Sequence, residues 1–328
     1  MSGFVYSLCG IILYILLMKS TENGPQQQLH VKSLLSEHKR IAYGILVHNN
    51  DTFYGMKQLI DKIDDKEHCF IVHIDKKYNM TATMNKSNVF MYQEYNITWG
   101  SYQMTESMVY LTTKAYEKCT FDIFQFLDGT TYPLHHKSRL QEFYDQLDDS
   151  IVMSSVKGFR SGKACTKKTM YVDPCKRTRS KCLTNDCTTL HNTPSNKMLY
   201  KGMQWVTLQY DFIKYMNDNP EWMTSWLEFF KPHRLNDEMF FQTILMDSGF
   251  KHQTLEKDIV QTVWGRCKSY KNWRSRKRWS PCLMGKKDFG RIEWDSLFLR
   301  KLQFDEPLKE MIDDYDYEID NILEYYKY

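Results

Sequence analysis

The chain has 328 residues, of which 42% are hydrophobic and 26% are charged. This ordinary globular composition excludes a globally disordered chain, a collagen-like repeat and a polytopic membrane protein, and the length suits one large domain or two modest ones. The net charge of +4 hides a split, because residues 305–328 carry −7 and residues 1–304 carry +11. Twelve bases in 266–301 would suit an anionic ligand, although a solvated basic loop is the alternative.

The first predicted element is an uncharged apolar run over residues 4–18, FVYSLCGIILYILLM. A run of this length and position predicts a signal anchor or a signal peptide over residues 1–19. No small-x-small cleavage site follows it, and because a polar stem comes next we favour an anchor that attaches the chain to a membrane. Residues 20–39 are polar and typical of a stem, and residues 40–328 would form one folded domain, secreted if the first segment is cleaved.

The nine cysteines agree with a secretory route. Cys9 lies in the apolar run, and the other eight are an even number, as expected for disulfides in an oxidising lumen. Four of them fall within 165–187 at spacings other than C-x-x-C, which argues against zinc and predicts a disulfide-stapled loop. Cys267 with Cys282 is a second expected pair, and the other pairings stay open. N-x-S/T sequons begin at Asn50, Asn79, Asn85 and Asn96.

Buried strands and amphipathic helices alternate through the next part of the chain. Near-continuous apolar runs predict strands at 41–48, 69–75, 88–92, 121–127 and 150–154. Helical spacing and cap residues predict helices at 52–63, 102–118 and 136–147. This alternation predicts an α/β domain with a mostly parallel central sheet flanked by helices. Ligands of such sheets bind at the carboxyl ends of the strands, where His48, Asp75 and Asp128 stand.

The second half of the chain is less regular. Residues 157–199 are polar and rich in cysteine, and they predict the stapled loop. Further apolar segments predict strands at 202–208 and 260–264 and helices at 211–217, 221–230 and 239–247. An apolar stripe from Leu308 to Leu323 predicts a C-terminal helix with its acids outside.

Two dipeptides could carry group-transfer chemistry. A transferase that uses a nucleotide-sugar must stabilise a departing diphosphate, and many do so with a metal held by Asp-x-Asp at a strand end. The Asp-x-Asp of this chain, at 314–316, lies in the acidic tail, so no metal or other cofactor is expected. Arg300 and Lys301 are then the candidates for the diphosphate, and a surface pair is the alternative.

Asp237 and Glu238, with Asn236, are predicted to open the helix 239–247. A carboxylate at this point could act as a general base toward a sugar hydroxyl, and a simple helix cap is the alternative. Three lone tryptophans, at 99, 205 and 264, would belong to the core on base rates, although their flat faces also suit stacking on sugar rings.

Eight segments in order resemble the core-2/I-branching glycosyltransferase family, which also contains the peptide O-xylosyltransferases. They include ILVHNN (45–50), FIVHIDKK (70–77), the strand followed by W-G at 88–107, FQFLDGTTYPLHHKSRLQEF (124–143), KGMQWVTL (201–208), LNDEMFFQTILMDS (235–248), Trp264 and LFLRKLQFD (297–305). The sequence departs from the family's pattern at Asp128, at Gln204 and by one extra residue in LQFD. The segment 157–199 matches nothing in the family.

The resemblance implies a GT-A-like fold, an inverting mechanism, a UDP-sugar donor and no metal. By position, Glu238 would be the general base, and Arg300 and Lys301 would hold the diphosphate. The uridine would lie against Val47 and Asp75 with Trp99 nearby, and the acceptor would lie against Asp237 and Trp264.

The reaction that we favour is transfer of N-acetylglucosamine from its UDP-sugar to a glycan or glycoprotein acceptor, where it forms a β-1,6 branch on an O-glycan. This reaction would take place in the Golgi lumen. The alternative within the family is a peptide O-xylosyltransferase or another UDP-sugar transferase. A catalytically inactive lectin-like module and a binder of anionic polymers through 266–291 are the readings from other classes. The secretory segment argues against a nucleic-acid partner.

Overall fold

A computed structural model of the chain describes residues 38–79, 83–153, 157–160, 198–233, 235–265, 267–269, 281–302 and 305–326. The predicted anchor, most of the predicted stem, the staple within 165–187 and residues 270–280 of the basic stretch lie outside the described residues. Among the helices described, none is both long enough and apolar enough to cross a membrane.

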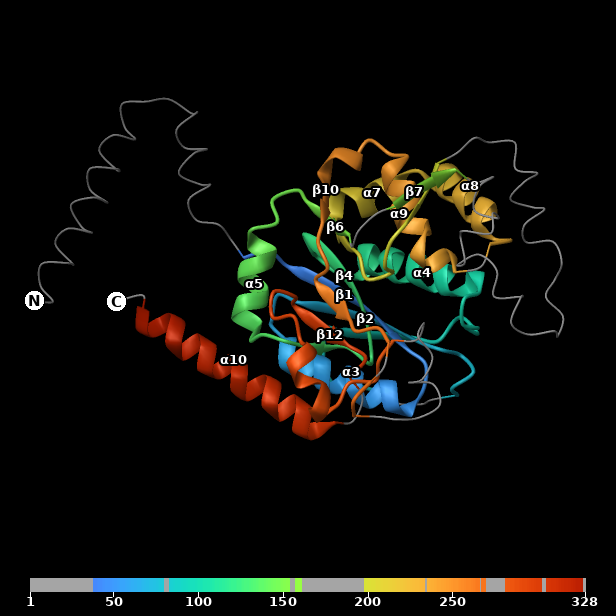
Figure 1. Cartoon of the computed structure of the whole chain (residues 1–328). Helices are drawn as coiled ribbons and strands as arrows, with labels where there is room; N and C mark the ends of the chain where they lie inside the picture. The colour runs from blue at the N-terminus through green and yellow to red at the C-terminus, as the bar shows by residue number, and fades with distance from the viewer. Residues whose placement is uncertain are drawn as a thin grey trace, which may run out of the picture. The chain divides into compact units, whose positions relative to one another are not determined.

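A seven-stranded sheet forms the centre of the unit Lys39–Tyr328, in the order β10-β6-β9-β4-β1-β2-β3 (Figure 1). Its strands are β1 (Ile41–Val47), β2 (Cys69–Ile74), β3 (Val89–Tyr92), β4 (Ile123–Asp128), β6 (Ile151–Met153), β9 (Thr207–Gln209) and β10 (Thr254–Glu256). Strand β9 is antiparallel to both of its neighbours, and the other adjacent pairs are parallel. The predicted mostly parallel sheet is therefore confirmed.

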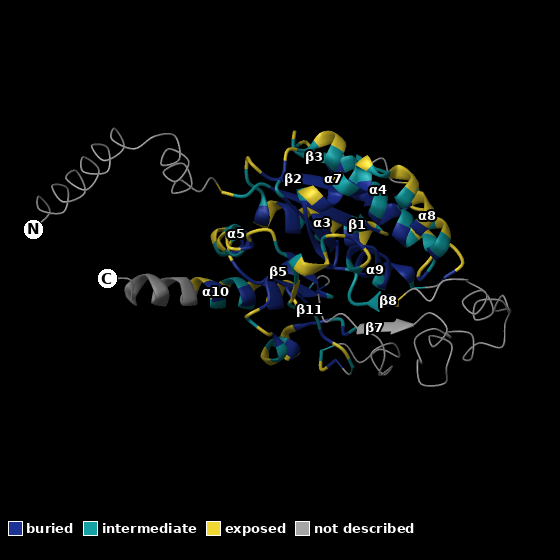
Figure 2. Cartoon of the chain, turned by 90° about the horizontal axis from the view of Figure 1, so that it is seen from above, coloured by how far each residue is buried: buried dark blue, intermediate teal, exposed yellow. Residues whose placement is uncertain are grey.

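Helices cover the sheet, so its central strands are buried, as Figure 2 shows. They are α3 (Asn50–Ile63), α4 (Tyr102–Lys118), α5 (Lys137–Asp145), α7 (Tyr210–Asp218), α8 (Pro220–Phe230) and α9 (Phe240–Met246). Burial on both faces explains why β1, β2 and β4 read as continuous apolar runs. Helix α3 begins two residues before the predicted helix 52–63, because the Asn49 side chain caps it by accepting from the Thr52 amide at 2.7 Å.

A second, three-stranded sheet packs beside the first, in the order β11-β12-β5. It comprises β5 (Tyr132–Pro133), β11 (Val260–Thr262) and β12 (Phe298–Arg300), and the C-terminal helix α10 (Glu306–Tyr326) covers part of it through Leu308 and Ile312. Short 3-10 turns lie at η4 (Lys251–Gln253) and η5 (Lys286–Arg291). The predicted C-terminal helix and the predicted Cys267–Cys282 disulfide are confirmed, and a further disulfide joins Cys69 to Cys119.

Three predictions about the second half of the chain were wrong. The predicted strand 202–208 is a strand only at its end, in β9, and residues 202–206 lie outside any strand. The ends of the predicted loop 157–199 are strands β7 (Lys157–Arg160) and β8 (Met198–Lys201), which pair antiparallel with each other. Cross-strand pairing stabilises these two strands of four residues, which are too short to show a periodic pattern in the sequence. Asp237 and Glu238 do not open helix α9 but form a separate 3-10 turn, η3 (Asn236–Glu238), before it.

Gly129 lies where the turn after β4 meets helix α3. A Cβ atom at Gly129 would lie 1.9 Å from the carbonyl oxygen of Thr52. We expect Gly129→Ala to lower the free energy of unfolding by about 3 kcal/mol, because this backbone contact cannot accommodate an added methyl group. Urea denaturation followed by circular dichroism would measure the loss. Gly249→Ala is the control, since a Cβ there meets no atom within 4 Å. Equal stability of the two variants would contradict the argument.

Candidate functional site

The sheet changes direction between β1 and β4, and this point gathers the predicted polar residues. From β1 the chain moves through α3 to β2 and β3, and it then returns through α4 to β4 on the other side of β1. Such a switch point leaves a crevice at the carboxyl ends of the two strands, where ligands of open α/β sheets bind. His48 follows β1 and Asp128 ends β4. The prediction of a site at these strand ends agrees with this topology.

Asp75, at the end of β2, is held in place by its neighbours. Its amide donates to the Val47 carbonyl at 2.8 Å, and its side-chain Oδ1 accepts from the amides of Lys77 and Ile97, each at 3.1 Å. Lys77 Nζ lies 3.4 Å from the other carboxylate oxygen. The Val47 side chain is buried in the core, so the exposed residue at this end of β1 is His48, which follows the strand.

Trp99 is 69% exposed and is therefore not a core residue. The next residue, Gly100, has a φ of 70°, and its carbonyl accepts from the Leu235 amide at 3.0 Å. This bond ties the turn that carries Trp99 to the segment that carries Asp237 and Glu238.

Arg300, at the end of β12, is buried between Asp128 and Trp205. Its Nη2 donates to Asp128 Oδ2 at 2.6 Å, and its guanidinium lies 4.1 Å from the centre of the Trp205 ring. The Arg300 Nε atom has no hydrogen-bond partner among the described residues. Sequence reasoning missed this arrangement, because it placed Trp205 only as a core or stacking residue and treated Asp128 as a departure from the family pattern.

The charged groups at the switch point change one another's pKa values. Burial alone would raise the pKa of the Asp128 carboxyl, but the charges of Arg300 and Lys301 and the hydrogen bonds to the carboxylate outweigh it and bring the pKa to about 2. Desolvation lowers the pKa of His48, and the charge of Asp128 opposes that shift only in part. The site thus combines a fixed carboxylate, two cations and an imidazole that loses its charge readily.

Asp237 and Glu238 lie side by side in η3 with different surroundings. Leu235, which precedes the turn, has a left-handed φ of 55°, and Asn236 is fixed by a 3.0 Å hydrogen bond from Thr105 Oγ1. Glu238 is partly accessible and forms an ion pair with Lys201. Asp237 is 3% exposed, and its Oδ1 has no partner among the described residues. Burial, together with the charge of Glu238, raises the pKa of Asp237 to about 7.

A short segment joins the two halves of the site. Lys201 pairs with Glu238, the Gly202 amide donates to the Glu238 carbonyl at 2.9 Å, and Trp205 stacks on Arg300. The four Cα-to-Cα steps from Lys201 to Trp205 can span at most about 14 Å, so the segment keeps the carboxylate of the predicted base near the predicted cations. Lys201 opens the KGMQWVTL segment, but nothing in that segment assigned it a role from the sequence.

A cavity of about 510 Å³ lies along β11, the strand that pairs with β12. Its lining residues are Met203, Asp258, Val260, Gln261, Thr262, Val263, Trp264, Arg291 and Glu293. Thr262 lies opposite Arg300 in the β11–β12 ladder, and its Oγ1 has no hydrogen-bond partner in the described part of the chain. Trp264 is 44% exposed, and Arg291 donates to its carbonyl at 3.0 Å. An exposed indole beside carboxylates and amides suits a sugar ring.

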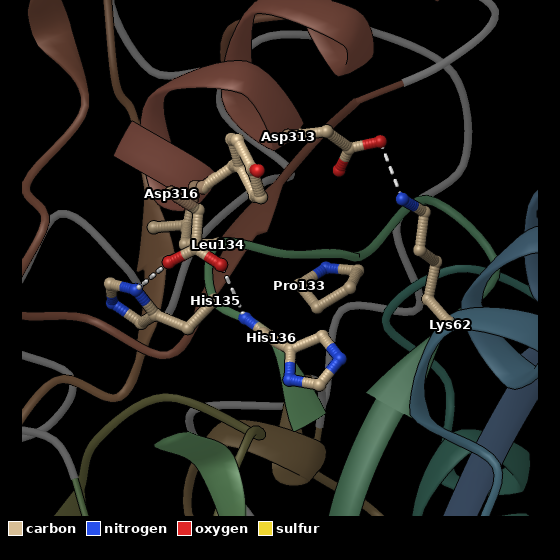
Figure 3. Close-up of a pocket in the computed structure, with 8 residues that line it drawn as sticks. Lys62, Pro133, Leu134, His135, His136, Asp313 and Asp316 are labelled. Atoms are coloured by element: carbon tan, nitrogen blue, oxygen red, sulfur yellow. Dashed lines mark hydrogen bonds and ion pairs between the residues drawn. The ribbon is translucent and has the colours of Figure 1, made fainter. Parts of the chain in front are cut away.

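A second cavity, of about 230 Å³, lies between α3, β5 and α10 and contains none of the predicted site residues (Figure 3). Asp316 accepts from His135 Nδ1 at 3.0 Å and from the His136 amide at 2.6 Å, and Asp313 pairs with Lys62. The Asp-x-Asp carboxylate in this cavity therefore holds α10 to the domain. Across the described residues, no group of three or more His, Cys, Asp or Glu side chains is arranged to bind a metal ion.

Comparison with known proteins decides the family. The model of the Core-2/I-Branching enzyme family matches residues 41–293, which is more than half of the chain. The chain belongs to the core-2/I-branching enzyme family. Xylosyltransferase 2 of Rattus norvegicus is 23% identical over 243 residues, covering 69% of this chain and 27% of that relative. The chain thus spans about a quarter of the length of the curated relative that it matches.

The family has a GT-A-like fold, and the mostly parallel sheet with flanking helices agrees with it, as the sequence predicted. The structure brings Arg300, Lys301, Asp128 and His48 together at the switch point and links them through 201–205 to Glu238. The roles of these residues in this core-2/I-branching enzyme remain predictions.

Proposed function

We propose that this core-2/I-branching enzyme is an inverting glycosyltransferase that uses a UDP-sugar and works without a metal ion. The observation that carries the proposal is the placement of Arg300 and Lys301 at the switch point, joined by residues 201–205 to the Glu238 carboxylate. A transferase needs one group that removes a proton from the acceptor and another that stabilises the leaving diphosphate. The two halves of the site offer one of each.

Glu238 is the proposed general base. It is accessible enough to meet an acceptor hydroxyl, whereas Asp237 is buried. As the glutamate takes the hydroxyl proton, the acceptor oxygen attacks the anomeric carbon from the side opposite the diphosphate, and the configuration inverts. The Lys201 ammonium pairs with Glu238 and holds its carboxylate in place before the acceptor arrives.

Arg300 and Lys301 are the proposed diphosphate ligands. Fixed cations at the point where negative charge develops stabilise the transition state by several kcal/mol in a site that excludes water. Both carboxylates at the strand ends are already engaged, Asp128 by Arg300 and Asp75 by Lys77. This pairing supports neutralisation of the diphosphate by side-chain cations instead of by a metal held between carboxylates.

The remaining predicted residues fit two subsites. The end of β1 at Val47, the fixed carboxylate of Asp75 and the exposed Trp99 are proposed to meet the uridine. Trp264, in the cavity beside β11, is proposed to stack on the acceptor sugar, with Asp237 supporting the turn that carries the base.

The sugar and the acceptor define two versions of the proposal. We favour N-acetylglucosamine transferred to form a β-1,6 branch on an O-glycan of a glycoprotein. Transfer of xylose to a peptide is the second candidate, and the similarity to a protein named xylosyltransferase 2 favours it. The enzyme would act in the Golgi lumen behind the predicted N-terminal anchor, and the exposed asparagines of all four sequons are compatible with that compartment.

The test is a panel of UDP-sugars offered to the purified protein with a mixed array of O-glycan and peptide acceptors. We expect transfer from one UDP-sugar to continue in excess EDTA, and mass spectrometry of the products would identify the sugar and the acceptor together. Activity that returns only on addition of manganese would contradict the metal-free mechanism. Sugar binding without transfer from any donor would favour the inactive lectin-like module instead.

A further inference from the structure

Asp128 is fixed independently of its partner Arg300. Its Oδ1 atom accepts three hydrogen bonds from the turn that follows β4, from the Thr130 amide at 2.8 Å, Thr130 Oγ1 at 2.7 Å and Thr131 Oγ1 at 3.1 Å. Only Oδ2 faces Arg300, at 2.6 Å. The carboxylate would therefore keep its position if the guanidinium turned toward another anion.

Arg300, unlike Asp128, is held by few polar contacts. Asp128 is its charged partner among the described side chains, its Nε lacks a hydrogen bond there, and its flat face rests on Trp205. A buried cation of this kind requires an anion, because removing its only counter-ion leaves a charge that water cannot solvate. The guanidinium also has unused donor capacity for a second anion, since it carries five N–H groups.

These two properties set up a competition once a diphosphate enters. Lys301 and His48 lie within electrostatic range of Asp128, so an anion bound to the cation pair shares its site with a carboxylate that cannot move away. Like charges in a water-poor site repel each other strongly. The carboxylate weakens the bound state of the anion, and it neutralises Arg300 as soon as the anion departs.

We propose that Asp128 is a built-in counter-ion that competes with the diphosphate of UDP for Arg300 and so promotes release of UDP after transfer. The inference rests on the proposed function, because it takes UDP as the leaving product. Release of product limits turnover in many enzymes. In this enzyme Asp128 is a positioning residue, because it contacts Arg300, the cation proposed to bind the diphosphate, and does not itself react.

The experiment removes the negative charge of Asp128 and keeps the shape of its side chain. In Asp128→Asn we expect UDP to bind at least about fivefold more tightly in isothermal titration calorimetry, and UDP to become a correspondingly stronger product inhibitor. Binding of uridine, which has no phosphate, should not change. The ligand-free variant should have a lower melting temperature than the wild type. Saturating UDP should raise the melting temperature of the variant by more than it raises that of the wild type, because the diphosphate supplies the anion that Arg300 has lost.

Asp122→Asn is the matched control. Asp122 immediately precedes β4 at its opposite end and pairs with Arg40, with Nη2 to Oδ1 at 2.8 Å. This variant should lose stability without any change in affinity for UDP. If Asp128→Asn fails to fold, Asp128→Ser provides the second variant, since its hydroxyl can still accept from the turn while the charge is removed.

Each outcome is decisive. Unchanged or weaker UDP binding by a folded Asp128 variant, with wild-type protein binding UDP normally, would overturn the counter-ion role and leave the proposed function intact. A wild-type protein that does not bind UDP at all would overturn the proposed function and the inference with it. Tighter binding of uridine as well as UDP would mean that Asp128 acts on the nucleoside and not on the diphosphate.

Discussion

Glu238→Gln should lower kcat by about 10²- to 10⁴-fold, the range that general base catalysis contributes. The amide keeps the size of the side chain and its place in η3, but it cannot accept the acceptor's proton. The affinity for UDP should stay within about twofold, because a general base contributes to the transition state and not to binding of the donor. Initial rates at saturating donor and acceptor, together with UDP titration, would measure both quantities.

The control for this variant is Glu117→Gln. Glu117 is also a glutamate paired with a lysine, Lys114 at 2.6 Å, but it lies near the end of helix α4. Replacing the Glu117 carboxylate with an amide should leave kcat unchanged. Turnover of Glu238→Gln equal to that of Glu117→Gln would remove Glu238 as the base.

Asp237→Asn should stabilise the protein, and the gain should grow with pH. Asp237 is buried without a partner for Oδ1 among the described residues, and its pKa rises from 3.8 to about 7 on folding. The folded chain therefore holds this proton more tightly than the unfolded chain does. The corresponding stability is fully present below pH 4 and is lost as the pH rises toward 7.

The asparagine does not titrate, so the variant should escape this loss. At 1.36 kcal/mol per pKa unit, the shift corresponds to about 4 kcal/mol at pH 8. Urea denaturation at several pH values between 4 and 8 would show the difference between variant and wild type widening with pH and levelling off above 7. The Asp218→Asn variant, which removes an exposed carboxylate, is the control. A difference that does not depend on pH would contradict the assignment.

Much of the first half of the fold followed from the sequence, because its strands are buried on both faces. Burial of that kind leaves a continuous apolar run, which is the signal at 41–48 and 69–75. The turn η3 left no such signal, since three polar residues before an apolar helix read equally well as its first turn. Strands β7 and β8 have only four residues each and form a two-stranded sheet of their own, so their sequences are too short to show alternation or a long apolar run.

The candidate site divides in the same way. Residues at strand ends, such as Asp75 and Asp128, could be placed because the alternation of strands and helices sets which end of the sheet they share. The contact between Trp205 and Arg300 joins positions far apart in the chain, and its formation depends on how the second sheet packs beside the first. Likewise, Cys69–Cys119 was one of many allowed pairings, and only the packing of α4 against β2 selects it.

The Cys69–Cys119 disulfide closes a covalent loop that contains only part of the candidate site. The loop closed by Cys69 and Cys119 contains Asp75 and Trp99, whereas Glu238 and Arg300 lie outside it. By loss of chain entropy, a closed loop of this length is worth about 4 kcal/mol, a large part of the net stability of a typical domain. Protein made in a reducing cytosol would lose that contribution first from the segment proposed to hold the nucleotide. Preparation through an oxidising compartment is therefore a condition for recovering a competent donor site.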